Sequence, residues 1–158
     1  MNVLKKFTSK RNDVFLAEDE NGRFVIKRYA KAEAAAAEKA VYDLLSGGKV
    51  RIPKILSSGE HELMLEYIEG VTFTELLESQ ERTKSVDFAP WEELVKWLCL
   101  FNKETGLAPG DCNLRNFILD AQGKVCGIDF EQCRESSILE TAGAVCAFVE
   151  LYDPQETP

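Results

Sequence analysis

The chain has 158 residues, of which 45% are hydrophobic and 29% are charged, a composition typical of a folded globular protein. Its formal net charge of −8 argues against nucleic acid as a general partner, because phosphate backbones attract basic surfaces. No run of about 18 apolar residues indicates a membrane span, and the polar N-terminus does not resemble an export signal. We therefore expect a cytoplasmic protein without a membrane partner.

The cysteine and histidine content excludes several kinds of site. The five cysteines are an odd number without C-x-x-C spacing, which argues against a disulfide framework or a zinc site. We expect them to be small, partly buried apolar side chains. His61 is the one histidine, so a histidine-based metal cluster or a catalytic triad cannot form within one chain.

The N-terminal part of the chain predicts β-strands around one helix. Asn21-Gly22 is a favoured sequence for a hairpin turn. The stretch 30–45 is rich in alanine, which favours helix, and carries an apolar stripe that includes Val41 and Leu45. The expected strands lie at 7–8, 14–17, 24–29, 54–57 and 62–68.

The second half of the chain has a mainly helical pattern. Thr72 and Glu75 form a candidate capping box, and Pro90 suits the first turn of a further helix. Ser137 and Glu140 form a second candidate capping box, which would open the last helix. The side chains expected to face inward are Trp91, Leu94, Val95, Leu98 and Phe101 on the helix at Pro90, and Ile138, Leu139, Ala142, Val145, Cys146 and Val149 on the last helix.

Three polar residues flank a predicted β-hairpin. Its strands, 117–120 and 125–129, place Asn116 just before the first strand and Asp129 at the end of the second, so the two side chains come together. Asp111 lies on the loop that leads into this hairpin. Oxygen ligands of this kind suit Mg²⁺ or Mn²⁺ bound together with nucleotide phosphates. Asp111 would face the same point and accept a proton from an attacking hydroxyl.

The segment Gly110–Leu119, followed by Gly127–Glu131, resembles the catalytic loop and the metal-binding motif of the protein-kinase-like superfamily. The resemblance is closest to the branch of aminoglycoside and choline phosphotransferases. It implies that Asp111 is the catalytic aspartate, that Asn116 is a metal ligand and that Asp129 is the principal metal ligand. It also implies ATP as the phosphoryl donor, with Mg²⁺ or Mn²⁺.

The same resemblance implies roles for residues of the N-terminal part. Lys27 would hold the α- and β-phosphates, and Glu38 on the following helix would pair with it. Glu38 is preferred to Glu33 because it shares a helical face with Val41. Val14 would cover the adenine ring, and a hinge would meet adenine through its backbone groups. The hinge residues are Glu66, Tyr67 and Ile68.

The fold class that we expect is α+β, a protein-kinase-like bilobal fold in a single domain. An N-terminal antiparallel sheet with one helix would occupy residues 1–69, and a short, mostly helical C-terminal lobe would occupy residues 70–158. This lobe is shorter than is usual in the superfamily. Three alternatives stay open: the lobe is minimal, the chain is shortened, or a homo-oligomer or partner chain completes the lobe.

The sequence departs from the superfamily pattern at several places. Pro109 stands where the family has a histidine before the catalytic aspartate, a histidine that braces the loop. Glu131 replaces the glycine of the protein-kinase metal motif, which favours the small-molecule branch. The loop 9–13 that would cover the nucleotide contains no glycine, although Lys10 or Arg11 can contribute charge there.

The expected function is ATP-dependent transfer of the γ-phosphate to a hydroxyl of a small-molecule acceptor. A sugar, an amino alcohol or an aminoglycoside-like compound fits this expectation. One alternative is a small atypical protein Ser/Thr kinase. Another is a catalytically weak nucleotide-binding module that regulates a partner, which the glycine-free loop, Pro109 and the short C-terminal lobe motivate.

Overall fold

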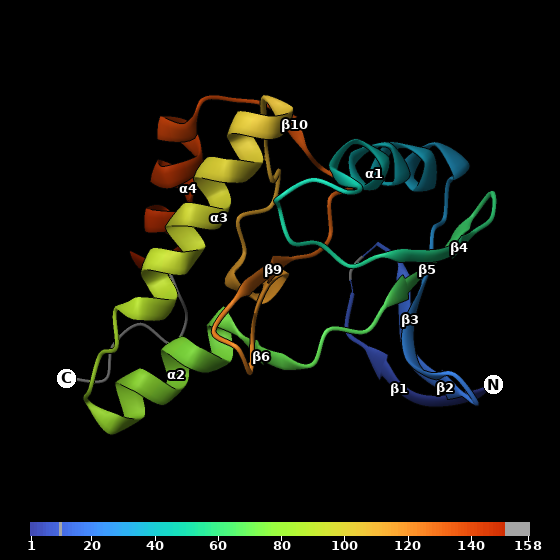
Figure 1. The fold of residues 1–158 in the computed structure, drawn as a ribbon, viewed down its shortest axis with the longest axis horizontal. Helices are drawn as coiled ribbons and strands as arrows, with labels where there is room; N and C mark the ends of the chain where they lie inside the picture. The colour runs from blue at the N-terminus through green and yellow to red at the C-terminus, as the bar shows by residue number, and fades with distance from the viewer. Residues whose placement is uncertain (10, 151–158) are drawn as a thin grey trace.

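The computed structural model describes residues 1–9 and 11–150, so Lys10 and residues 151–158 lie outside the described part. The N-terminal part forms an antiparallel five-stranded sheet in the order β1-β2-β3-β5-β4 (Figure 1). This agrees with the antiparallel sheet that the sequence predicts. Its strands are β1 (Asn2–Phe7), β2 (Asp13–Asp19), β3 (Gly22–Arg28), β4 (Ile55–Ser58) and β5 (Glu62–Glu66).

The β2–β3 hairpin forms at the predicted Asn-Gly turn. Gly22 has a φ of +121°, which glycine adopts without strain, and the Asn21 N–H donates to Asp19 Oδ1 at 2.8 Å. The first strand was wrongly expected at 7–8, because β1 runs over residues 2–7. It is an edge strand whose side chains are mostly exposed, so its sequence lacks the alternation that identifies half-buried strands.

One face of the sheet carries Lys27, the predicted phosphate-binding lysine. Lys27 on β3 pairs directly with Val14 on β2 and with Leu63 on β5. Residues opposite one another on neighbouring strands project to the same face. The other face carries a separate small cluster formed by Ala17, Phe24 and Ile26 with Phe15 and Met64.

Helix α1 (Ala32–Leu45) packs against the five-stranded sheet (Figure 1), and the contact between its Glu38 and Lys27 places it on the face that carries Lys27. It begins two residues later than expected and ends before Ser46, close to Gly47 with a φ of +76°. The alanine-rich sequence provides intrinsic helix preference. Its buried positions recur every three or four residues, which places a carboxylate on the face that meets the sheet. These positions are Ala35, Glu38, Val41, Tyr42 and Leu45.

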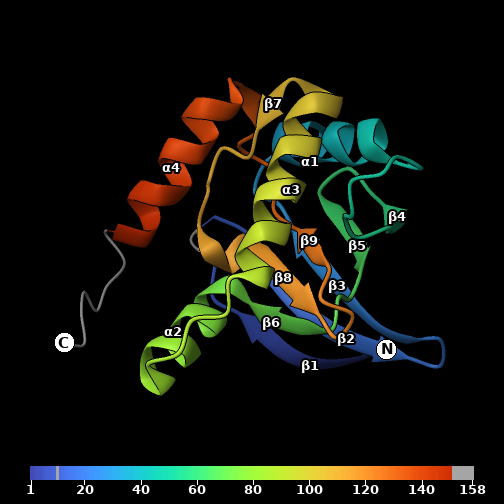
Figure 2. The same cartoon turned by 60° about the vertical axis from the view of Figure 1, so that its left-hand side comes forward.

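As far as residue 150, the second half of the chain contains three helices and a second sheet. The sheet has the strand order β6-β8-β9, and helix α3 packs beside α4 (Figure 2). A short pair of strands, β7 and β10, and a single 3-10 turn complete it. The elements are β6 (Gly70–Thr72), α2 (Phe73–Thr83), α3 (Ala89–Thr105), β7 (Leu107–Ala108), η1 (Leu114–Asn116), β8 (Phe117–Asp120), β9 (Val125–Gly127), β10 (Arg134–Glu135) and α4 (Ile138–Glu150).

The predicted start signals of α2, α3 and α4 are confirmed. At α2, the Glu75 N–H donates to Thr72 Oγ1 at 3.2 Å and Glu75 Oε2 accepts the Thr72 N–H at 2.7 Å. At α4, the Glu140 N–H donates to Ser137 Oγ at 3.3 Å and the Ser137 N–H donates to Glu140 Oε2 at 3.1 Å. Each box satisfies backbone N–H groups that a helix start leaves without partners. Pro90 lies in the first turn of α3, as expected.

A group of stacked aromatic rings joins α3 to the core of the second half through Phe130. Trp97 stacks on Phe101 at 5.0 Å and on Phe130 at 6.4 Å between ring centroids. Trp97 also meets Phe117 edge to face at 5.5 Å. Phe130 is 1% exposed, so the residue after Asp129 is anchored in the core. This packing fixes the end of β9.

Several expected inward positions are wrong. Val95 is 58% exposed and Leu139 is 81% exposed, and Ala142 and Cys146 are exposed as well. On α3 the buried stripe is Leu94, Trp97, Leu98 and Phe101, with spacing that leaves Val95 outside it. On α4, Thr141 is buried while Ile138 and Val145 are partly buried, and the Val149 side chain lies outside the described part. The apolar residues of α4 extend around the helix, so periodicity did not identify its packed face.

Replacing two of the glycines by alanine is expected to change the free energy of unfolding in opposite directions. A Cβ at Gly127 would overlap the ring of Trp97, whereas a Cβ at Gly143 in α4 would meet nothing within 4 Å. We expect Gly127→Ala to lower the free energy of unfolding by about 1–3 kcal/mol through overpacking. We expect Gly143→Ala to raise it by about 0.4–1 kcal/mol, because alanine is the better helix former. Urea unfolding of both variants checks this, and a neutral Gly127→Ala would contradict the packing.

The structure confirms the α+β fold class with a kinase-like arrangement of sheet, α1 and helical second half. The five-stranded sheet ends at Glu66 and the second sheet begins at Gly70, on either side of the segment predicted as the hinge. Among residues 1–9 and 11–150, no helix is both long enough and apolar enough to span a membrane.

Candidate active site

The centre of the candidate site is an ion pair between the sheet and α1. Lys27 Nζ lies 2.6 Å from Glu38 Oε2 and 2.7 Å from Asp129 Oδ1. The Lys27 side chain is 7% exposed and that of Glu38 is fully buried, whereas that of Asp129 is 43% exposed. The lysine therefore lies between a buried carboxylate and one that faces solvent.

Glu38 has a complete set of hydrogen-bond donors around it. Its Oε2 accepts from Lys27 Nζ and, at 2.8 Å, from the Tyr29 hydroxyl. Its Oε1 accepts from the Phe130 N–H at 3.2 Å. A carboxylate that is removed from water needs such partners to offset its lost hydration. Glu38 thus joins α1, β3 and the Asp129-Phe130 segment in one contact.

Burial and the neighbouring charges set the protonation of these groups. Burial alone would lower the pKa of Lys27, but the carboxylates of Glu38 and Asp129 outweigh burial and raise it above its ordinary value. Burial raises the pKa of Glu38, and the nearby lysine opposes that change. Burial and then the Glu38 carboxylate raise the pKa of Tyr29. At neutral pH, Lys27 is therefore a cation and Tyr29 is a neutral donor.

Asp129 is held in an unusual backbone conformation. It follows β9 after one intervening residue, Ile128, and its φ of 65° lies in the left-handed region that non-glycine residues rarely adopt. Such a conformation costs on the order of 1–3 kcal/mol and is concentrated at functional sites. The anchored ring of Phe130 and the hydrogen bond from its N–H to Glu38 hold the turn in place.

A carboxylate that the sequence interpretation had not assigned to the site completes an acidic cluster. Oxygen atoms of Glu38, Asp129 and Glu131 all lie within 4.8 Å of one another. Because Glu38 is buried and already bonded to three donors, Asp129 and Glu131 are the pair that could hold a cation. Two carboxylates offer the hard oxygen donors that Mg²⁺ and Mn²⁺ prefer, so the residues fit such an ion.

The loop that carries Asp111 is connected to this cluster through Asn116. Asn116 Nδ2 donates to the Asp111 backbone carbonyl at 3.1 Å, and the Asn116 carbonyl accepts from the Ile128 N–H at 2.9 Å. Asp111 is exposed, and its Oδ1 accepts the Asn113 N–H at 3.1 Å. The structure thus places Asn116 beside the residue that precedes Asp129, as the hairpin predicts. The roles of Asp111 as catalytic residue and Asn116 as metal ligand stay predictions.

Gly110 brings the Asp111 loop close to the segment after the acidic cluster. A Cβ at Gly110 would overlap the backbone carbonyl of Gln132. The strand pair β7–β10, with Ala108 opposite Arg134, holds the two segments together from the other side. Glycine is therefore required here for close approach of two backbones.

The residues expected to contact adenine border the same sheet. Val14 lies on the face of the sheet that carries Lys27 and is partly buried. The expected strand 62–68 ends early, at Glu66, so Tyr67 and Ile68 lie in the connection to β6. Glu66 Oε2 accepts from the Lys54 N–H at 3.1 Å, and the Glu66 N–H donates to the Lys54 carbonyl at 2.8 Å. The adenine contacts of these residues stay predictions.

Two further side chains at the site were not predicted. Tyr29 could have been found, because alternate residues of a strand share a face and it lies two positions after Lys27. No pattern in the sequence indicated that Asn12 would contact the acidic cluster. Its Nδ2 donates to Glu131 Oε2 at 2.6 Å across a sequence separation of 119 residues.

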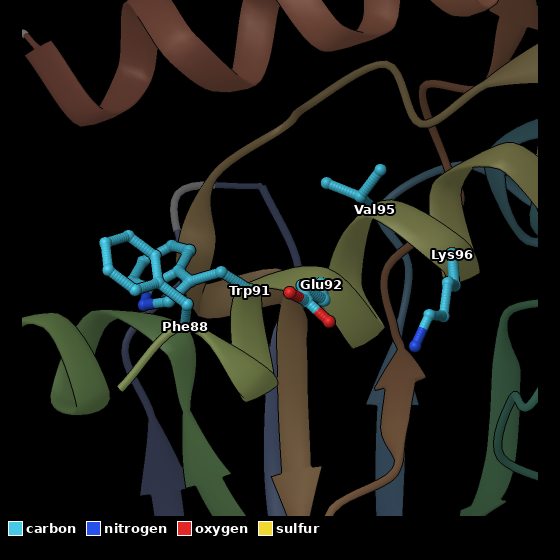
Figure 3. A pocket seen from close by; sticks show the side chains of 5 residues that line it. All are labelled: Phe88, Trp91, Glu92, Val95 and Lys96. Carbon is cyan, nitrogen blue, oxygen red and sulfur yellow. The ribbon is translucent and has the colours of Figure 1, made fainter. Parts of the chain in front are cut away.

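A hollow on the surface of α3 is not part of this site. It has a volume of about 490 Å³ and shares no residue with the acidic cluster. Its lining is mostly apolar and comes from the N-terminal end of α3 and the residue before it (Figure 3). The five residues are Phe88, Trp91, Glu92, Val95 and Lys96.

The antiparallel sheet, the buried Lys27–Glu38 pair and the acidic hairpin end define a protein-kinase-like phosphotransferase fold. Residues 4–88, more than half of the chain, match the phosphotransferase enzyme family, and the chain belongs to this family. It is also 33% identical over 103 residues to the Bacillus subtilis (strain 168) protein named "Putative serine/threonine-protein kinase YrzF". That match covers 63% of this chain and 46% of the relative, so the chain spans about half of the relative's length.

Proposed function

We propose that the protein transfers the γ-phosphate of ATP to a hydroxyl group of a small-molecule acceptor. The observation that carries this proposal is the position of Lys27 Nζ, 2.6 Å from Glu38 and 2.7 Å from Asp129. A further carboxylate, that of the partly buried Glu131, lies beside Asp129. A fixed cation next to two acids that can share a metal ion suits the phosphates of a nucleoside triphosphate, which bind both a lysine and a metal ion. Membership of the phosphotransferase enzyme family supports the same class of reaction.

Each residue of the site has a part in binding. Lys27, fixed by Glu38, neutralises the α- and β-phosphates, while backbone groups of the Glu66–Ile68 connection and the Val14 side chain hold adenine. Asp129 and Glu131, with Asn116, would hold a Mg²⁺ or Mn²⁺ ion. Such an ion supplies charge neutralisation at the phosphate oxygens when it is bound.

The reaction itself requires little covalent chemistry from the protein. Asp111 accepts the proton of the acceptor hydroxyl, whose oxygen forms a bond to the γ-phosphorus. The bond between that phosphorus and the oxygen that bridges to the β-phosphate breaks, and ADP leaves with the electron pair. The exposure of Asp111 suits this role, because an acceptor can reach its carboxylate from solvent.

A second candidate function is protein Ser/Thr phosphorylation, which the name of the Bacillus subtilis relative favours. One experiment separates the candidates. The purified chain is incubated with labelled Mg·ATP, with a panel of sugars, amino alcohols and aminoglycosides, and with the protein alone. Label on a small molecule supports the proposal, and label on protein supports the second candidate. Nucleotide binding without any transfer would contradict both and favour a regulatory module.

A further inference from the structure

The loop between β1 and β2 turns one polar side chain toward the acidic cluster. Asn12 is partly buried, whereas its neighbours Arg11 and Asp13 are exposed. Its Nδ2 donates to Glu131 Oε2 at 2.6 Å, and its backbone N–H donates to Ser9 Oγ at 3.3 Å. Both the side-chain amide and the backbone N–H of Asn12 are therefore held by hydrogen bonds.

Asn12 lies at the end of the sheet where the phosphates are proposed to bind. It precedes β2 directly, and two residues later Val14 stands opposite Lys27. The carboxylate that Asn12 contacts shares the acidic cluster with Asp129, whose Oδ1 binds Lys27 Nζ. Asn12, on the loop before β2, and Lys27, on β3, thus reach the same cluster.

The chemistry of the amide fits a phosphate oxygen. A carboxamide has two N–H donors, so one can bind a phosphate while the other keeps Glu131. The sequence of the loop, 9–13, contains no glycine, and so its backbone amides approach a ligand less freely than those of a glycine-rich loop. A side-chain donor compensates for this loss.

We infer that Asn12 binds the terminal phosphate of the nucleotide, in place of the backbone amides that a glycine-rich loop would supply. The inference rests on the proposed function, since it requires a nucleotide bound at this site. It differs from a bracing role, in which Asn12 only ties the loop to Glu131. It also differs from a blocking role, in which the Asn12–Glu131 hydrogen bond must break before a nucleotide can bind.

The test measures the affinity of Mg·ADP and Mg·AMP-PNP by isothermal titration calorimetry. The variants are Asn12→Ala, Asn12→Asp and, as a matched control, Asn21→Ala in the turn between β2 and β3. A hydrogen bond to a charged group is strong enough that Asn12→Ala should weaken Mg·AMP-PNP roughly tenfold or more. Mg·ADP, which lacks the terminal phosphate, should change less than about twofold by the same reasoning. Asn12→Asp should weaken Mg·AMP-PNP further, because its charge repels both Glu131 and the phosphate.

Four outcomes would overturn the inference. An equal loss for both nucleotides would mean that Asn12 only braces the loop. Tighter nucleotide binding by Asn12→Ala would mean that the Asn12–Glu131 hydrogen bond must break before a nucleotide can bind. If the unmodified chain bound neither nucleotide, the proposed function would fail together with the inference, whereas binding of both by the unmodified chain with no effect of Asn12→Ala would reject the inference alone.

Discussion

Replacing Glu38 by alanine is expected to lower the free energy of unfolding by about 3–5 kcal/mol, the usual cost of removing one partner of a buried ion pair. The carboxylate accepts from Lys27 Nζ, the Tyr29 hydroxyl and the Phe130 N–H, all within 3.2 Å. Its removal leaves these donors without that acceptor in a site with little access to water. A cavity replaces the side chain as well, which adds to the loss.

The matched control is Glu33→Ala on the same helix. Glu33 is exposed in the first turn of α1, so its replacement should change the free energy of unfolding by no more than about 0.5 kcal/mol. Urea unfolding, followed by circular dichroism, measures both variants. If Glu38→Ala unfolded within about 0.5 kcal/mol of Glu33→Ala, the buried contact described for Glu38 would be wrong.

Asp111→Asn is expected to reduce phosphotransfer by about 10²–10⁴-fold, the usual contribution of a positioned general base. Asparagine keeps the shape of the side chain and an oxygen that can accept the Asn113 N–H, but it cannot take the acceptor's proton. Because Asp111 is exposed, the melting temperature should stay within a degree or so of the unmodified chain. The measurement is ADP release from Mg·ATP with the acceptor that the screen identifies.

Asp87→Asn provides the control for Asp111→Asn. Asp87 Oδ1 accepts the Ala89 N–H at 3.0 Å, in the same way that Asp111 Oδ1 accepts the Asn113 N–H. Both substitutions therefore disturb a similar turn, and only Asp111→Asn should lose transfer. Binding of Mg·AMP-PNP should survive in both variants. Full transfer activity in Asp111→Asn would contradict the proposed proton acceptor.

Local sequence signals predicted the parts of the fold that depend on neighbouring residues. The Asn21-Gly22 turn and both capping boxes involve groups at most three residues apart, and the structure has them. The position of Asn116 beside the residue before Asp129 also followed from one short hairpin. The Lys27–Glu38 contact was reached through family resemblance together with helical periodicity, which favoured Glu38 over the exposed Glu33.

Features that depend on tertiary packing could not be predicted in this way. The Asn12–Glu131 hydrogen bond joins two loops separated by 119 residues, and no periodic pattern connects them. The need for glycine at position 110 comes from the Gln132 backbone, which a sequence window around Gly110 does not reveal. Val95 and Leu139 are apolar yet exposed, because hydrophobicity alone does not say which side of a helix is covered.

The most direct test of the nucleotide site is a thermal melt with and without millimolar Mg·ATP, on the unmodified chain and on Asp129→Asn. Asparagine tolerates the left-handed backbone of this position, so the variant removes the charge while it keeps the turn. A ligand that binds only the folded chain must raise its melting temperature. We predict a clear rise for the unmodified chain and a much smaller one for Asp129→Asn. Equal rises in both, or no rise in the unmodified chain, would contradict the assignment of Asp129 and the acidic cluster to Mg·ATP.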